Sequence, residues 1–148
     1  MTKTDLHLEE FLPYRLSYLT NVIGRDLARL YTDKFGIAHA EWRVMAVLGL
    51  SSGVSAAIVA EKTAMDKVAV SRAINNMIEN KHVTRTFADD DKRRSVLKLS
   101  DLGRETYEKI VPLVQAYEKD VLNALSEAEQ KEIDKILDKL TDCVNQSK

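Results

Sequence analysis

Residues 66–99 have the sequence DKVAVSRAINNMIENKHVTRTFADDDKRRSVLKL, and this stretch decides the fold. Asp66, a good N-cap residue, precedes apolar residues at helical spacing, namely Val70, Ala73, Ile74, Met77 and Ile78. Two β-prone runs, 83–87 and 96–99, then flank a polar and highly charged link at 88–95. The stretch therefore predicts a helix followed by a β-hairpin.

Further helices are predicted on both sides. Apolar residues recur at three- and four-residue steps from about Leu12 to Phe35, which indicates a long amphipathic helix. A second helix follows Gly36 and stops at residues 51–53, and Ser55 can cap a short third helix over residues 56–62. Downstream, a fifth helix begins at residue 100 or 101, and the capping box at 126–129 begins a sixth.

Two short helices joined by a tight turn, here the third and the fourth, make a helix-turn-helix, and the hairpin that follows is its wing. The expected fold class is mainly α with a small β-hairpin wing: a winged helix-turn-helix flanked by N- and C-terminal helices. The length of 148 residues suits one functional unit and is too short for two independent domains.

The net charge of −1 hides an uneven distribution along the chain. Residues 61–98 hold nine Lys/Arg against six Asp/Glu, residues 1–60 hold six of each, and residues 99–148 hold seven against eleven. Only the central segment has the excess of cations that neutralises phosphates.

We expect a cytosolic protein without membrane contact, because the N-terminus is acidic and polar and no apolar run reaches the length of a membrane span.

Metal and disulfide chemistry are not expected. The single cysteine, Cys143, excludes an intramolecular disulfide and a multi-cysteine zinc site. Asp89, Asp90 and Asp91 lack further ligands at fixed spacing, so Asp91 is expected to bond the turn backbone or orient an arginine, with the others solvated.

Three motifs occur in the order and at the separations of one known family. They are GIAHAEWRV at 36–44, VSR at 70–72, and DKRR at 91–94 followed by LKLS at 97–100 and Gly103. With the flanking helices, they resemble the multiple antibiotic resistance regulator (MarR) family along nearly the whole chain. Two departures concern helix ends. Ala38 replaces a frequent capping Thr or Ser at the start of the second helix. His82 stands where a Gly usually takes the left-handed conformation after the fourth helix, which the resemblance makes the DNA-recognition helix.

The resemblance implies a homodimer that binds palindromic double-stranded DNA and is released by a small ligand. Residues 1–35 and 101–148 would supply the dimerisation helices, and residues 36–100 the DNA-binding lobe. One lobe reaches one half-site, so two copies about one helical turn apart are needed. Repression is the commonest mode in the family and is the expected outcome.

Helical geometry selects the residues expected to face DNA. With Val70, Ile74 and Met77 in the core, about 100° per residue turns the other side of this helix toward the major groove. Arg72 is expected at a guanine edge or at a phosphate, and the asparagines at adenine or in solvent. The expected contacts are Lys67, Val68, Ala69, Ser71, Arg72, Asn75 and Asn76, with Arg93 and Arg94 of the wing in the minor groove.

The resemblance also implies a pocket for an effector between the dimerisation helices and the DNA-binding lobe. Arg15 is a candidate for a carboxylate, beside Tyr14, Ser17 and Tyr18, and the second helix would add His39, Trp42 and Arg43. The alternative is that the aromatic residues are core and Arg15 makes a structural ion pair. A phenolic or hydroxycinnamate-type acid is the effector expected by analogy, and no other cofactor is expected.

Two other classes of function compete with this hypothesis. An enzyme is not expected, because the three histidines are scattered and neither a phosphate-binding loop nor a nucleophile–base pattern occurs. The alternative is a winged-helix module that binds protein without sequence-specific DNA binding. The cationic central segment and Arg72 favour DNA.

Overall fold

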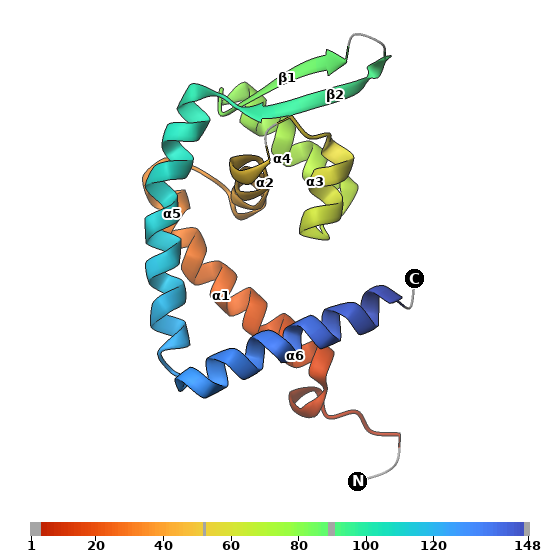
Figure 1. Ribbon diagram of the computed structural model, residues 1–148, viewed down its shortest axis with the longest axis vertical. Helices are drawn as coiled ribbons and strands as arrows, with labels where there is room; N and C mark the ends of the chain where they lie inside the picture. The colour runs from red at the N-terminus through yellow and green to blue at the C-terminus, as the bar shows by residue number, and fades with distance from the viewer. Residues whose placement is uncertain (1–3, 52, 89–90, 147–148) are drawn as a thin grey trace. The chain divides into compact units, whose positions relative to one another are not determined.

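The computed structural model describes residues 4–51, 53–88 and 91–146. Its elements in chain order are η1 (Leu8–Glu10), α1 (Leu12–Phe35), α2 (His39–Leu50), α3 (Ala56–Thr63), α4 (Lys67–Glu79), β1 (Val83–Ala88), β2 (Asp91–Leu99), α5 (Asp101–Leu122) and α6 (Glu127–Gln146) (Figure 1). These elements confirm the predicted mainly α fold with a β-hairpin wing. The chain forms two compact units, residues 1–112 and 113–148.

The core of the first unit lies among α2, α3, α4 and the base of the hairpin. Its fully buried residues include Val44, Met45, Leu48, Val59, Val70, Ile74, Met77 and Leu97. Burying each such side chain stabilises the fold by about 1.5–3 kcal/mol. The apolar stripe predicted for α4 is confirmed, with Ile78 only half-buried at its margin. The buried side of α4 is thereby fixed against the core, so the opposite side of this helix faces away from the core.

The hairpin is longer than predicted. β1 and β2 pair antiparallel from Val83↔Leu99 to Phe87↔Ser95, and Ala88 then pairs with Asp91. The predicted hairpin is confirmed, but the link between its strands is shorter than residues 88–95. The register shifts after Phe87, which leaves residues 92–94 as a bulge in β2. Polar residues at a sheet edge can pair without an apolar pattern, because backbone groups make the ladder.

The base of β2 is held on both edges. The amide of Leu97 donates to the carbonyl of Val54 at 2.8 Å, and the amide of Gly53 donates to the carbonyl of Leu97 at 3.0 Å. Farther out, β2 pairs with β1 alone among the described residues. The root of the wing is thus fixed to the helices while its outer part projects.

The helix α4 ends in a Schellman motif. The amide of His82 donates to the carbonyl of Met77 at 2.8 Å, and that of Lys81 donates to Ile78 at 3.0 Å. Lys81 is the left-handed residue, with φ +66°. The expectation that His82 takes this conformation is therefore wrong, because α4 ends at Glu79 and the left-handed position falls one residue earlier.

We expect Lys81→Gly to raise the free energy of unfolding by about 1 kcal/mol, because glycine adopts positive φ without the Cβ clash of an L-residue. Denaturant unfolding of both proteins measures the difference. Ala64, which follows α3 at φ +56°, offers a second test through Ala64→Gly. A loss of stability in both variants would contradict this explanation.

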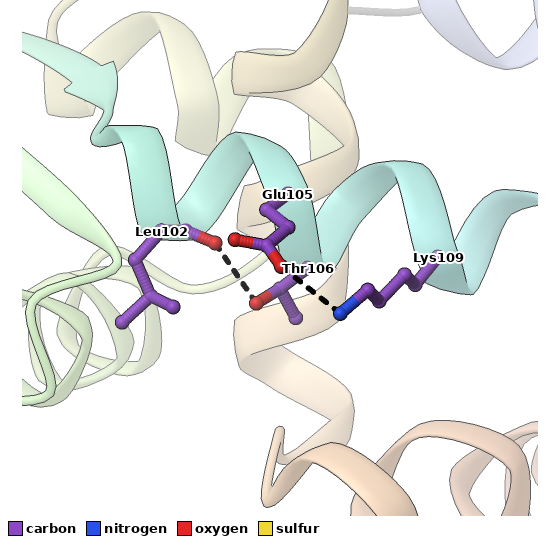
Figure 2. A network of polar contacts seen from close by, with 4 residues as sticks. All are labelled: Leu102, Glu105, Thr106 and Lys109. Carbon is purple, nitrogen blue, oxygen red and sulfur yellow. Dashed lines mark hydrogen bonds and ion pairs between the residues drawn. The ribbon is translucent and has the colours of Figure 1, made fainter.

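The start of α5 is anchored to the end of α4. The Ser100 hydroxyl accepts a hydrogen bond from the amide of Gly103 at 2.9 Å and donates to the carbonyl of Lys81 at 2.5 Å. Farther along, Thr106 donates to the carbonyl of Leu102 at 2.9 Å, and Lys109 pairs with Glu105 at 3.0 Å (Figure 2). The start of α5 is therefore fixed to the segment that ends α4.

The second unit contains the end of α5 and α6. Ser126 and Glu129 form the predicted capping box, with N···O distances of 2.8 and 3.2 Å. The hydrogen bonds from the Ser126 backbone and side chain hold the pKa of Glu129 below its usual range. On α6, apolar residues at helical spacing are exposed: Ile133, Ile136, Leu137 and Val144. In the described ranges, no helix has the length and apolar character needed to cross a membrane.

Candidate nucleic-acid interface and effector-site residues

The face of α4 turned away from the core is polar and exposed. Its N-terminus is capped by Asp66, whose carboxylate accepts a hydrogen bond from the amide of Ala69 at 3.3 Å. Val68 is 55% exposed and Ala69 is half-buried. The remaining predicted residues of this face are all exposed: Lys67, Ser71, Arg72, Asn75 and Asn76. The structure therefore brings the predicted helix residues onto one surface.

Arg72 lies at the centre of this surface. None of the described residues forms a hydrogen bond or an ion pair with its guanidinium. Asn75 and Asn76 are three and four residues along the helix, so they lie beside it on the helix surface. A guanidinium and two carboxamides are the groups that pair bidentately with guanine and adenine edges. Their contact with DNA stays a prediction.

The predicted wing arginines lie in the bulged part of the hairpin. The backbone of Arg93 and Arg94 belongs to β2, between the paired positions Asp91 and Ser95. Their side chains lie outside what the structure describes, as do residues Asp89 and Asp90. Within the described ranges, no three His, Cys, Asp or Glu side chains gather as a metal site.

Arg43 has a structural partner. Its guanidinium donates to the carbonyl of Thr63 at 2.6 Å, at the C-terminus of α3. A cation at this end interacts favourably with the helix dipole and with an otherwise unpaired carbonyl. This contact favours a packing role for Arg43, and its role toward an effector stays a prediction.

Aromatic rings from α1, α2 and α5 form a stack. Tyr31 stacks on Trp42 with centroids 5.6 Å apart, and Trp42 on Tyr107 at 6.1 Å. The guanidinium of Arg104 lies 5.4 Å from the centroid of Tyr107 and donates to the carbonyl of Gly49 at 3.0 Å. We call Tyr31, His39, Trp42 and Tyr107 the aromatic stack; it joins three helices across the first unit.

Tyr31 is the buried member of this stack. It is fully buried, and burial raises the pKa of its hydroxyl to about 12. The Tyr31 hydroxyl is hydrogen-bonded to Nδ1 of His39, and the His39 ring also stacks on the Tyr31 ring. The sequence predicted His39 and Trp42 as site residues, but not Tyr31, Tyr107 or Arg104. No local pattern pairs residues 42 and 107, which meet only after folding.

The first-helix candidates do not meet this stack within one chain. Tyr14, Arg15, Ser17 and Tyr18 are all exposed. The His39 ring lies beside Gly24, 3.5 Å from where a Cβ would stand. Arg15 precedes Gly24 by nine residues, which is about 14 Å along α1 and about half a turn around it. A cavity of about 240 Å³ at the N-terminal segment involves none of the candidates; its lining is Asp5, Leu6, His7, Glu10 and Phe11.

The stack makes stability depend on pH. Partial burial, and next the charge of Arg43, lower the pKa of His39. Because the unfolded chain then binds this proton more readily, the stabilisation is fully present above the usual histidine pKa, and it is lost as the pH falls from there through the lowered pKa of the folded protein. We expect the melting temperature to fall between pH 7.5 and 5, and to fall less in His39→Gln. The control is His7→Gln, outside the stack; an equal fall in both variants would refute the assignment.

Comparisons with known proteins agree with the winged helix-turn-helix fold. A model of the MarR family matches residues 35–94. A MarR/EmrR family transcriptional regulator from Acinetobacter sp. ADP1 is 30% identical, over 95% of this chain and 99% of that one, with a TM-score of 0.87. The HTH-type transcriptional regulator BilQ of Clostridium symbiosum is 25% identical over 127 residues, 84% of this chain and 88% of that protein.

A third similarity is one of fold. The structure of Bordetella bronchiseptica BpsR, which concerns regulation of its DNA binding by 6-hydroxynicotinic acid, has a TM-score of 0.82 at 22% identity. It covers 93% of this chain and 98% of that one. The chain is thus similar in sequence to transcriptional regulators and similar in fold over nearly its whole length.

Proposed function

Because the chain belongs to the MarR family of transcriptional regulators, we propose that it represses transcription as a homodimer bound to palindromic operator DNA, and that a small aromatic carboxylate releases it. The single observation that carries the DNA-binding part is the exposed face of α4, where Arg72, Asn75 and Asn76 lie together on a helix whose other side is fully buried. A rigid helix with free base-pairing groups suits the major groove. We place the protein in the cytosol, where this DNA lies.

The proposed homodimer follows from apolar surface that the chain leaves exposed. Before and along α1, large apolar residues are 41–54% exposed: Leu8, Phe11, Leu12, Leu16 and Leu19. The stripe on α6 is a second such face. Contiguous exposed apolar surface favours association, and two copies supply the two half-sites of a palindrome. We infer that a second copy of the chain covers both faces.

For the effector we propose a site that takes groups from both copies. Arg15, with Tyr14, Ser17 and Tyr18, would bind the carboxylate, and His39 and Trp42 of the other copy would contact the ring, since these residues do not meet within one chain. The fold similarity to BpsR, whose DNA binding is regulated by 6-hydroxynicotinic acid, supports a ligand of this class.

Two experiments test the proposal. Bound duplexes are selected from a random double-stranded pool by the purified protein; we expect an inverted repeat with half-site centres about ten base pairs apart. No enrichment would favour the protein-binding module instead.

Because Trp42 is the sole tryptophan, its fluorescence reports directly on the effector. A hydroxycinnamate should quench it and release the operator in the wild type, and do neither at the same concentration in Arg15→Gln.

A further inference from the structure

Phe87 is a large apolar residue that the wing leaves exposed. Its exposed fraction is 58%, against 2% for Val83 on the same strand. Side chains alternate along a strand, so Val83, Arg85 and Phe87 lie on one face of β1. Val83 packs into the core, and Arg85 and Phe87 continue the same face beyond the core's edge.

This face is the one turned toward the helices. β1 lies against α4 (Figure 1), and Leu97, the cross-strand partner of Arg85, is fully buried. Thr84 and Thr86 occupy the opposite face. Arg85 and Phe87 are nevertheless exposed, so they lie beyond the edge of the core on the outer part of the wing, the second element predicted to contact DNA.

The charge of the hairpin favours DNA as the occupant of this face. Residues 83–99 hold five Lys/Arg against three Asp/Glu, whereas the C-terminal helices proposed for the dimer interface are acidic. The groove walls of DNA combine apolar deoxyribose with anionic phosphate, which a phenyl ring beside a guanidinium complements. The register shift follows directly after Phe87, so the regular pairing of the two strands ends at this residue.

We propose that Phe87 packs against the deoxyribose wall of the minor groove flanking each half-site, while Arg85 neutralises a phosphate beside it. The inference rests on the proposed DNA-binding function and adds an apolar component to it. The two residues contribute in ways that can be separated, because neutralising a phosphate releases counterions and apolar contact does not.

The test is a salt series of operator affinities, measured by fluorescence anisotropy with the full chain and the selected operator. Phe87→Ser is expected to weaken binding about tenfold at every salt concentration, because each dimer loses two buried rings. The slope of log affinity against log salt concentration should stay unchanged. Phe87→Leu should restore most of the affinity.

Arg85→Gln is expected to reduce the magnitude of this slope by about 2, because each of the two chains loses its contact with one phosphate. Thr86→Ala, on the opposite face, is the matched control and should behave as the wild type.

The outcomes separate this inference from the function on which it rests. Wild-type binding with unchanged affinity in Phe87→Ser would overturn the inference alone. So would a change of oligomeric state in Phe87→Ser without a change in affinity, because the ring would then contact protein. Absence of operator binding by the wild type would overturn the proposed function and this inference with it.

Discussion

Arg72→Ala is expected to lose at least about thirtyfold in operator affinity, because each bidentate contact to a base contributes about 1–3 kcal/mol and a dimer makes two. Arg72 is exposed and no described residue engages its guanidinium, so its removal should leave the fold unchanged. Anisotropy titrations of the selected operator measure the loss. Unfolding curves that coincide with the wild type are the control for structure.

Arg72→Lys distinguishes the two ways in which this residue can bind DNA. If the guanidinium pairs with guanine, a lysine retains the charge but loses the fork, and affinity stays low while preference at one base pair relaxes. If Arg72 contacts only a phosphate, Arg72→Lys should bind almost as the wild type. Full affinity in Arg72→Ala would contradict the assignment of α4 as the recognition helix.

Gly103→Ala is expected to lower the free energy of unfolding by about 3 kcal/mol or more, because a Cβ at this position meets a backbone atom that cannot rotate away. It would stand 2.0 Å from the carbonyl oxygen of His82. That carbonyl also accepts the amide of Ser100 at 2.9 Å, so the start of α5 must shift and its cap must break. Chemical denaturation followed by circular dichroism measures the change.

Gly24→Ala is the matched control for this prediction. Gly24 also lies in a helix, but a Cβ there meets nothing closer than 3.5 Å. Alanine in a helix interior is favoured over glycine by about 1 kcal/mol, so this variant should be as stable as the wild type or more so. Equal stability of the Gly103→Ala and Gly24→Ala variants would show that the contact with His82 does not constrain α5.

Much of the fold could be predicted from local sequence because its elements carry their own boundaries. Ser55, Asp66 and Ser126 cap helices where the sequence places them, and the buried stripe of α4 follows from helical spacing alone. The extent of the hairpin could not be predicted, because Asp91 and Ser95 are polar and pair through their backbone. The left-handed Lys81 was missed for a similar reason: no residue type marks the position where the chain turns.

The two candidate sites differ in how far sequence predicts them. The surface of α4 is set by one helix and its buried side, so the exposure of Arg72, Asn75 and Asn76 follows from periodicity. The aromatic stack depends on residues 31, 42 and 107 meeting across three helices, and Gly49 leaves room for the Tyr107 ring there. Such a contact has no local pattern, which is why only His39 and Trp42 were predicted.

The central claim is that two copies of this chain bind one palindrome together. Its most direct test is native mass spectrometry of the protein with the selected operator, combined with affinities for the full inverted repeat and for a single half-site. We expect a complex of two chains and one duplex, and a half-site affinity weaker by at least about a thousandfold, close to that of non-specific DNA. One chain per half-site, binding both duplexes with equal affinity, would contradict the claim.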